Sequence, residues 1–344
     1  MSTHTGTAPG RLSLKQRLFA SPETKQLADT IDAGIAVIEA GLSDELHFAD
    51  DLADVSGRYL LEAGGKRVRP MLTLLTAQLG NGATPEVITA AQAIEITHLA
   101  SLYHDDVMDE APLRRGVPST HEVWGNSVAI LTGDLLFSRA STLMTRLGER
   151  AMALQSETFE RLCLGQLHET IGPKDGEDPI AHYIQVLADK TGSLISAAAR
   201  CGIVYSGAPE EYEEAVVEFG DKIGVAFQLA DDVLDLSPDS ATGKEAGTDL
   251  RAGVPTLPTL LLAQQATTDP AAAELLALIR HPDTTDAELQ DAIAQLYAHP
   301  VTQATREEAR RWASEAVEAL AILPEGAVKK ALSAFAEHVV SRSA

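Results

Sequence analysis

Apolar residues along this chain recur with the spacing of α-helices rather than of β-strands. Four long stretches carry this pattern, at residues 21–42, 84–110, 127–147 and 209–236. No long stretch alternates apolar and polar residues with a period of two, which is the spacing that a half-buried strand would need. We therefore expect an all-α protein.

Local signals place the ends of several of these helices. Ser21 and Thr84 are predicted N-caps, because each precedes a proline at the first helical position. Pro112 has no amide hydrogen, so it is expected to end the second helix. Near the C-terminus, Thr285 and Glu288 have the spacing of a capping box.

The chain is expected to form one domain over residues 21–344, after a disordered tail at residues 1–20. Two longer loops are predicted at 172–179 and 237–258, and neither is rich enough in Pro, Gly or Ser to be a linker between domains. The stretch 127–147 is apolar on almost all sides, so we expect it near the centre of a bundle of long, mostly antiparallel helices.

Charge restricts the classes of partner. The 344 residues include 50 acidic and 27 basic side chains, so the formal net charge is −23. Such a chain repels nucleic acid and anionic lipid on average. An anionic substrate would therefore need a local group of cations or a bound metal ion.

The cellular compartment of the protein is predicted from segments that the sequence lacks. It has no apolar run of 18 or more residues that could span a membrane, and its first residues contain no apolar signal core. Cys163 and Cys201 have no metal-ligand spacing and lie in apolar surroundings, so we expect two buried thiols in a reducing cytoplasm.

Two short stretches concentrate carboxylates within apolar helices. Asp105 and Asp109 are four residues apart and share one helix face, with Asp106 beside them. Like charges at this spacing destabilise a helix unless something offsets them. A solvated acidic face would explain one such cluster, but the pattern occurs twice. The second copy, in LADDVLDL, consists of Asp231, Asp232 and Asp235.

Oxygen ligands without His or Cys favour Mg²⁺ over zinc. Mg²⁺ is usually held by one or two carboxylates together with substrate phosphates, so two aspartate-rich faces across a cavity predict a diphosphate clamp. Cations suited to phosphate lie nearby, because Arg114 and Arg115 directly follow the first cluster. The stretch GGKRVRP adds Lys66, Arg67 and Arg69 after two glycines, which allow close approach of the backbone.

Several motifs occur together in one order: GGKRVRP, HLASLYHDDVMDEAPLRRG, GNSVAILTGDLLF, KTGSL, FQLADDVLD and GKEAGTDL. With these motifs the chain resembles the trans-type isoprenyl diphosphate synthases, the polyprenyl synthetase family, from about residue 20 to its end. The resemblance implies a homodimer whose subunits are helical bundles around a deep apolar cavity.

The resemblance also implies roles for individual residues. Three Mg²⁺ ions would be held by the six aspartates of the two clusters, Asp105, Asp106, Asp109, Asp231, Asp232 and Asp235. Isopentenyl diphosphate would be bound by Lys66, Arg69, His98 and Arg115. The allylic diphosphate would contact Arg114, Lys190 and Lys244, with Thr191 and Gln228 beside the reacting carbons. The catalytic set would be Asp105, Asp109, Arg114, Lys190, Thr191, Gln228, Asp231 and Lys244.

The implied reaction needs no protein nucleophile. Metal ions and cations stabilise the leaving diphosphate, and the allylic substrate ionises to a carbocation. The double bond of isopentenyl diphosphate attacks this cation, and the released diphosphate takes the proton. The Thr191 hydroxyl and the Gln228 amide are neutral dipoles that can steady the cation without trapping it.

Small residues suggest a long product. Ala100 and Ser101 stand five and four positions before the first aspartate, where bulky residues limit chain growth in the family, and Ser138 and Ser141 on the facing helix are also small. The resemblance therefore implies a long-chain all-trans polyprenyl diphosphate of about seven to ten isoprene units, as used for a quinone side chain. Tyr103 could narrow the path.

One position departs from the family pattern. Val254 stands where the family often has a lysine, and Arg251 is a candidate replacement. Two alternatives stay open: a short-chain geranyl, farnesyl or geranylgeranyl diphosphate synthase, and a non-catalytic partner subunit of a heteromeric synthase. A terpene cyclase would not need GGKRVRP. At most a transient membrane contact is expected, during product release.

Overall fold

The structure of the protein is a computed structural model that describes residues 22–238, 246–281 and 283–341. Within these ranges the chain is almost entirely helical, which confirms the all-α prediction, and two-residue strands occur only in one short hairpin.

The first elements are α2 (Pro22–Glu45), α3 (Asp51–Glu62), α4 (Val68–Ala77), α5 (Pro85–Met108), β1 (Leu113–Arg114), β2 (Val117–Pro118), α6 (Thr120–Trp124), α7 (Asn126–Leu147), α8 (Glu149–Ile171), α9 (Pro179–Leu187) and a π-helical turn, η1 (Ala188–Gly192). The remaining elements are α10 (Ser193–Ser206), the 3₁₀ turn η2 (Glu210–Tyr212), α11 (Glu213–Asp235), α12 (Thr248–Arg251), α13 (Leu257–Gln265), α14 (Pro270–Arg280), α15 (Asp286–Ala298), α16 (Pro300–Ala319), the 3₁₀ turn η3 (Leu320–Ile322) and α17 (Ala327–Ser341).

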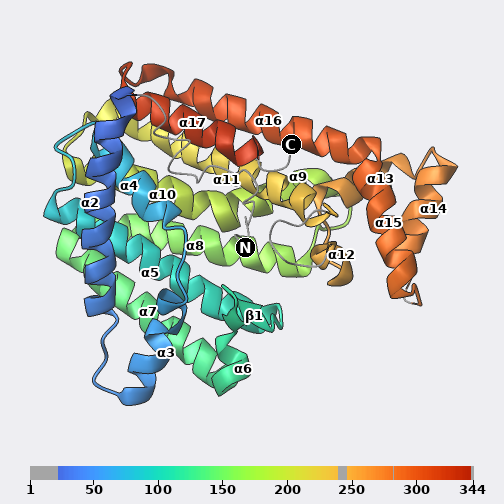
Figure 1. The fold of residues 1–344 in the computed structure, drawn as a ribbon, viewed down its shortest axis with the longest axis horizontal. Helices are drawn as coiled ribbons and strands as arrows, with labels where there is room; N and C mark the ends of the chain where they lie inside the picture. The colour runs from blue at the N-terminus through green and yellow to red at the C-terminus, as the bar shows by residue number, and fades with distance from the viewer. Residues whose placement is uncertain (1–21, 239–245, 282, 342–344) are drawn as a thin grey trace, which may run out of the picture.

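The long helices form a bundle in which α5, α7, α8, α10 and α11 run along the length of the molecule (Figure 1). At one end α2 crosses the bundle, and α16 packs along α11. At the opposite end α13, α14 and α15 gather around a small apolar cluster of their own. The main core includes Leu72, Ile94 and Phe219, none of which is exposed.

Helix α5 begins as predicted but ends earlier. Thr84 accepts a hydrogen bond from Val87 N at 3.2 Å, which confirms it as the N-cap before Pro85. The last helical residue is Met108, four residues before the proline expected to end the helix. The reason is Glu110, whose φ of +48° is left-handed and turns the chain into the β1–β2 hairpin.

The other predicted helix ends have mixed outcomes. The capping box is confirmed, since Thr285 N donates to Glu288 Oε2 at 2.9 Å and Glu288 N donates to Thr285 Oγ1 at 3.3 Å. Helix α2 begins at Pro22 as expected, whereas its predicted cap, Ser21, lies outside the described residues, as do residues 1–20.

Two expectations about burial are wrong. Helix α7 is not central, because it packs on α5 with one side while Ile130 and Leu131 on another side are 43% and 61% exposed. An apolar helix can thus mark a face that a single chain leaves uncovered. Cys201 is buried as expected, but Cys163 is exposed. It follows Leu162, which points into the interior, so it falls on a different face of α8.

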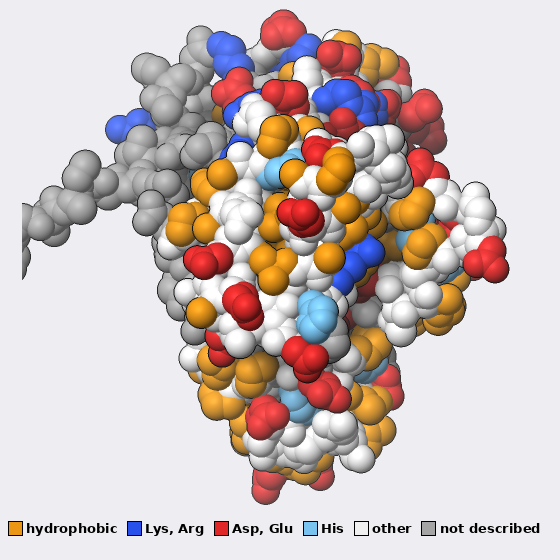
Figure 2. Space-filling model, turned by 90° about the vertical axis from the view of Figure 1, so that its right-hand side faces the viewer, with side chains coloured by type: hydrophobic (Ala, Val, Ile, Leu, Met, Phe, Trp, Pro, Cys, Tyr) orange, Lys and Arg blue, Asp and Glu red, His pale blue; other side chains and the backbone are white. Residues whose placement is uncertain are grey.

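Figure 2 shows the surface of the molecule at the end of the bundle where α13–α15 lie. Hydrophobic and acidic side chains share this surface, and it is hollowed beside a group of Lys and Arg side chains (Figure 2). None of the helices among the described residues is long and apolar enough to cross a membrane.

Candidate active site

Two cavities, of about 700 and 900 Å³, lie next to each other in this bundle. They share four lining residues, Asp109, Arg114, Lys190 and Gln228. Most of the predicted site residues that the structure describes line one cavity or the other. The structure therefore brings together motifs that are more than 160 positions apart in the sequence, such as GGKRVRP and LADDVLDL.

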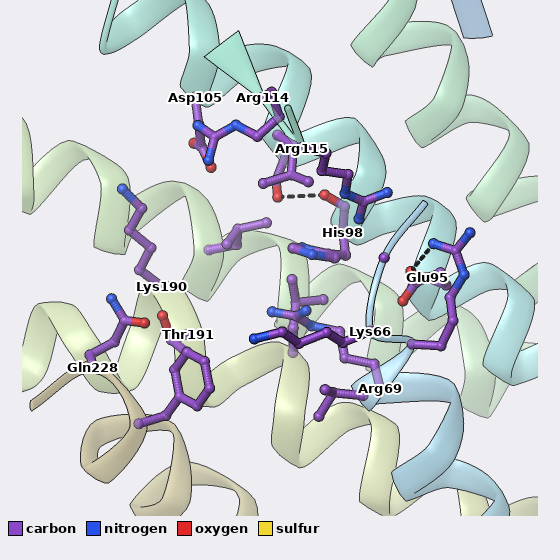
Figure 3. Close-up of a pocket in the computed structure, with 18 of the residues that line it drawn as sticks. Lys66, Arg69, Glu95, His98, Asp105, Arg114, Arg115, Lys190, Thr191 and Gln228 are labelled. Atoms are coloured by element: carbon purple, nitrogen blue, oxygen red, sulfur yellow. Dashed lines mark hydrogen bonds and ion pairs between the residues drawn. The ribbon is translucent and has the colours of Figure 1, made fainter. Parts of the chain in front are cut away.

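The smaller cavity is basic. Its described lining contains six cationic side chains, Lys66, Arg67, Arg69, Arg114, Arg115 and Lys190. It contains three carboxylates, Glu95, Asp105 and Asp109. Figure 3 shows Lys190, Thr191 and Gln228 on one side, facing His98, Lys66 and Arg69 on the other. We call this space the basic cavity.

One cation of the GGKRVRP stretch pairs with a carboxylate of the same cavity. Arg67 has a φ of +48°, its side chain is buried, and it pairs with Glu95 of α5 at 3.1 Å. It also donates to the Leu61 carbonyl at 3.2 Å, so it fixes the turn before α4. Sequence reasoning missed Glu95, although it lies three residues before His98 and therefore on the same face of α5.

The other nitrogen-bearing side chains on this side of the basic cavity can donate N–H groups to an anion. Burial lowers the pKa of Arg69 to about 10, which still leaves it charged at neutral pH. Its Nε is buried and has no hydrogen-bond partner among the described residues. Arg115 is anchored through a 2.6 Å hydrogen bond to the Leu60 carbonyl. Burial and the neighbouring arginines lower the pKa of His98 well below its usual value, so its imidazole is neutral at pH 7.

The larger cavity is acidic. Six carboxylates line its described surface, from Asp109, Glu169, Asp231, Asp232, Asp235 and Asp249. Only two cationic side chains do so, Arg114 and Lys190. An anionic substrate could enter this space only with cations that balance these carboxylates. We call it the acidic cavity.

Two aspartates of the first cluster line a cavity, and the third is buried and binds Arg114. Asp105 and Asp109 line the basic cavity, and burial raises the pKa of Asp105 to about 6, although Lys190 lowers it. Asp106 is fully buried and accepts a 2.6 Å hydrogen bond from Arg114 Nε. Its second oxygen, Oδ2, is buried without a hydrogen-bond partner among the described residues. In this arrangement Asp106 orients Arg114.

The second cluster is partly engaged by the protein itself. Tyr183 donates its hydroxyl to both oxygens of Asp232, at 2.9 and 2.8 Å, and Leu257 N donates to Oδ2 at 3.1 Å. Burial is the main reason why the pKa of Asp232 is raised to about 7. Asp235 accepts from Thr248 N at 3.1 Å, at the start of α12. All three aspartates of this cluster nevertheless line the acidic cavity.

The donor set fits a hard divalent cation. The acidic cavity presents carboxylate oxygens, and no His or Cys is among its described lining residues. In the described part of the chain, no three His, Cys, Asp or Glu side chains are already grouped to hold a metal ion. Mg²⁺ does not need such a group, because substrate phosphates and water complete its coordination.

Lys190 and Thr191 lie on the π-helical turn between α9 and α10, and both line the basic cavity. Lys190 Nζ pairs with Glu169 of α8 at 2.5 Å. Burial lowers the pKa of Lys190, but Glu169 and Asp105 outweigh it and raise the pKa above its ordinary value. Glu169 was not predicted, and no motif around it would have identified it.

Within the described ranges, the predicted phosphate contacts after the second aspartate cluster are not found at the two cavities. Lys244 is outside the described residues. Arg251 pairs with Asp286 of α15 at 3.1 Å and lines neither cavity, while Val254 lines the acidic cavity without supplying a charge.

Of the residues considered for product length, some line a cavity and others do not. Ser101 lines the basic cavity with a small side chain, whereas the buried Ala100 lines neither cavity. Tyr103 lines neither cavity, because its hydroxyl donates to Ser56 O at 2.5 Å and accepts from Leu60 N at 3.2 Å. These bonds hold its ring against α3. Ser138 is exposed on α7 and so does not face the interior.

Comparison with known proteins gives a consistent result. The family model described as polyprenyl synthetase matches residues 51–296. The chain is 43% identical over 317 residues to a nonaprenyl diphosphate synthase of Mycobacterium tuberculosis, which covers 92% of this chain and 94% of the relative.

Solved structures are similar over nearly the whole chain. A geranylgeranyl pyrophosphate synthase from Corynebacterium glutamicum, complexed with calcium and isoprenyl diphosphate, has a TM-score of 0.83 at 40% identity, over 94% of this chain and 98% of that one. A decaprenyl diphosphate synthase from Rhodobacter capsulatus has a TM-score of 0.83 at 34% identity, over 93% and 99%.

Proposed function

The chain belongs to the polyprenyl synthetase family, and from this premise we propose that it condenses isopentenyl diphosphate with an allylic diphosphate to give a long-chain all-trans polyprenyl diphosphate. The observation that carries this proposal is the opposite charge of two adjoining cavities. Two diphosphates must lie close together for the condensation, and each cavity suits one of them in a different way.

The basic cavity suits the diphosphate of isopentenyl diphosphate, which it can bind without metal. Lys66, Arg69 and Arg115 supply charge and N–H donors, and the bidentate geometry of arginine matches phosphate oxygens. His98 is neutral there, so it adds a directed hydrogen bond rather than a further charge. Glu95 offsets part of the positive charge while the cavity is empty of substrate.

The acidic cavity suits the allylic diphosphate together with divalent cations. We expect Mg²⁺ at the two aspartate clusters, three ions in all, where it would neutralise the leaving diphosphate. Arg114 and Lys190 lie where the two cavities meet, so they can bind that diphosphate from the protein side. Gln228 lines the same junction and Thr191 lines the basic cavity beside it, where their neutral dipoles would face the cationic carbons.

The product is proposed to be long because Ser101 leaves the wall of the basic cavity without a bulky side chain. Tyr103, the residue that could have narrowed the path, is held against α3 by two hydrogen bonds. Relatives named nonaprenyl and decaprenyl diphosphate synthases support this choice. The short-chain alternative is kept because a geranylgeranyl pyrophosphate synthase, at 40% identity, lies between the nonaprenyl synthase at 43% and the decaprenyl synthase at 34%.

We propose a homodimer formed through α7 and α8. These two helices pack on each other and expose a set of large apolar side chains, Ile130, Leu131, Leu135, Met152, Phe159, Leu164, Leu167 and Ile171. Exposed apolar side chains that gather on packed helices often mark a protein–protein interface, and a second copy would bury these. Light scattering should give the mass of two chains for the wild type and of one chain for Leu131→Asp. A monomeric wild type would refute the dimer.

A product assay tests the function directly. The purified protein is incubated with Mg²⁺, labelled isopentenyl diphosphate and farnesyl diphosphate, and the product lengths are resolved. A ladder that ends at about seven to ten isoprene units supports the proposal. A product of four units or fewer would keep the reaction but favour the short-chain alternative. Absence of product with every allylic primer would favour a non-catalytic partner subunit, and turnover without Mg²⁺ would refute the role of the acidic cavity.

A further inference from the structure

Arg161 of α8 joins three segments behind the wall that carries Lys190. Its Nε donates to Asp189 Oδ1 and its Nη1 donates to Asp221 Oδ1 of α11, both at 3.0 Å. Its Nη2 donates to the Ala188 carbonyl at 3.2 Å. Gln185 Nε2 donates a hydrogen bond to the other oxygen of Asp189, Oδ2, at 2.8 Å. None of these five residues lines the basic or the acidic cavity.

The Ala188 carbonyl has a second role in the backbone. It accepts the hydrogen bond from Ser193 N, five residues on, which closes the π-helical turn. This turn interrupts what is otherwise one continuous helical segment from α9 to α10. Single π turns are rare and are often found at functional sites. Arg161 therefore binds the carbonyl group whose pairing makes this turn π-helical rather than α-helical.

The turn determines which side chains face the substrate. Lys190 and Thr191 are adjacent in sequence, yet both line the basic cavity and point towards it together (Figure 3). Adjacent side chains diverge in any helix, by about 100° per residue in an α-helix, so the side chains that reach the cavity depend on how this turn is wound. A relaxation of the turn to α-helical bonding would change the rotation of these two side chains relative to α9, α10 and the cavity.

We propose that Arg161 is a positioning residue for the condensation: it clamps the π-helical turn through Asp189, Asp221 and the Ala188 carbonyl, and so keeps Lys190 and Thr191 in place. The catalytic consequence rests on the proposed function, whereas the clamp itself is independent of it. Because Arg161 does not touch the cations that would bind isopentenyl diphosphate, its loss should affect turnover far more than the KM for that substrate.

The test compares Arg161→Gln with Arg200→Gln in the full-length protein. Arg200 is a matched control, because it also pairs with two carboxylates, Glu213 at 2.7 Å and Glu157 at 3.4 Å, and is about as exposed as Arg161. It lines neither cavity. With farnesyl diphosphate, isopentenyl diphosphate and Mg²⁺, Arg161→Gln should lower kcat about 100-fold, as expected for reacting groups misplaced by about 1 Å. The KM for isopentenyl diphosphate should stay within about twofold of wild type.

A second readout does not depend on activity. Amide hydrogen exchange over residues 188–193 should be faster in Arg161→Gln and unchanged in Arg200→Gln. Arg161→Lys should restore part of both kcat and protection, because a lysine can make some of the same contacts. If Arg161→Gln does not fold, Arg161→Lys and Asp189→Asn are measured in its place.

Each outcome decides the proposal. Unchanged exchange in a folded Arg161→Gln protein would overturn the clamp. Faster exchange with unchanged kcat would overturn the positioning role, as would an equal loss of kcat in the Arg200 control. If the wild type forms no product with any primer, the proposed function fails, and hydrogen exchange alone decides whether Arg161 clamps the turn.

Discussion

Gly224 of α11 packs directly on the π-helical turn. A Cβ at this position would lie 2.4 Å from Gly192 Cα and 2.6 Å from Gly192 N, whereas ordinary Cβ contacts begin near 3.4 Å. Both obstructing atoms belong to the backbone, so no side chain can rotate to make room. Gly224→Ala should therefore separate α11 from the turn by about 1 Å, and misplacement of that size costs about 100-fold in rate. This corresponds to about 2.7 kcal/mol of activation free energy.

The effect of Gly224→Ala on stability should be smaller. Overpacking of a close contact costs about 1–3 kcal/mol. Alanine is favoured over glycine within a helix by about 1 kcal/mol. The free energy of unfolding should therefore fall by about 0–2 kcal/mol, which leaves the protein folded under assay conditions. The measurements are kcat, with farnesyl and isopentenyl diphosphates, and urea unfolding of the same preparation.

Gly80→Ala is the control for this experiment. A Cβ at Gly80 would lie 2.6 Å from Ala208 N, so it meets backbone nearly as closely as at Gly224, but beyond the far end of α10. It should lose stability while keeping kcat. The reasoning would be refuted if Gly224→Ala kept kcat within about threefold of wild type, or if Gly80→Ala lost as much activity.

Further predictions concern product length, the acidic cavity and the thiols. Ser101→Phe places a ring in the wall of the basic cavity and should shorten the product in the chain-length assay, so an unchanged product would contradict the proposed growth path. Arg251→Ala should leave the KM of both substrates within about twofold, because Arg251 pairs with Asp286; a large rise would make it a phosphate ligand after all. Burial raises the pKa of Cys201 to about 12, so a thiol reagent should not modify it before unfolding. Cys163 is exposed, but partial desolvation of its thiol raises its pKa, so it should react faster as pH rises. It should also react faster in monomeric Leu131→Asp than in a dimer, and equal rates would argue against an interface at α8.

The parts of the fold that depend on neighbouring residues could be predicted from the sequence. The Thr84 cap and the Thr285–Glu288 capping box follow from local spacing, and the structure confirms both. The shared face of Asp105 and Asp109 follows from helix geometry, and both carboxylates line the basic cavity. Local signals suffice here because each involves partners within one helical turn.

Features that depend on distant partners could not be predicted in this way. The basic stretch at residues 64–70 gives no sign that Arg67 turns inward, because its partner Glu95 lies 28 positions further on. The exposure of Cys163 depends on which side of α8 faces the core. The stretch ADKTG contains no signal for a π-helical turn, since the turn is held by Arg161 from another helix.

The π-helical turn also has a consequence for how such proteins can change over time. A hydrogen bond to the fifth residue encloses one residue more than the bond to the fourth residue in an α-helix. A deletion of the codon for Ala188, Asp189 or Gly192 would let α9 and α10 continue as one regular helix. The bundle would keep its helices, but the side chains of Lys190 and Thr191 would be rotated relative to the cavity. In the proposed homodimer, a duplicated gene could thus give rise in one step to a folded but inactive copy that pairs with an active one.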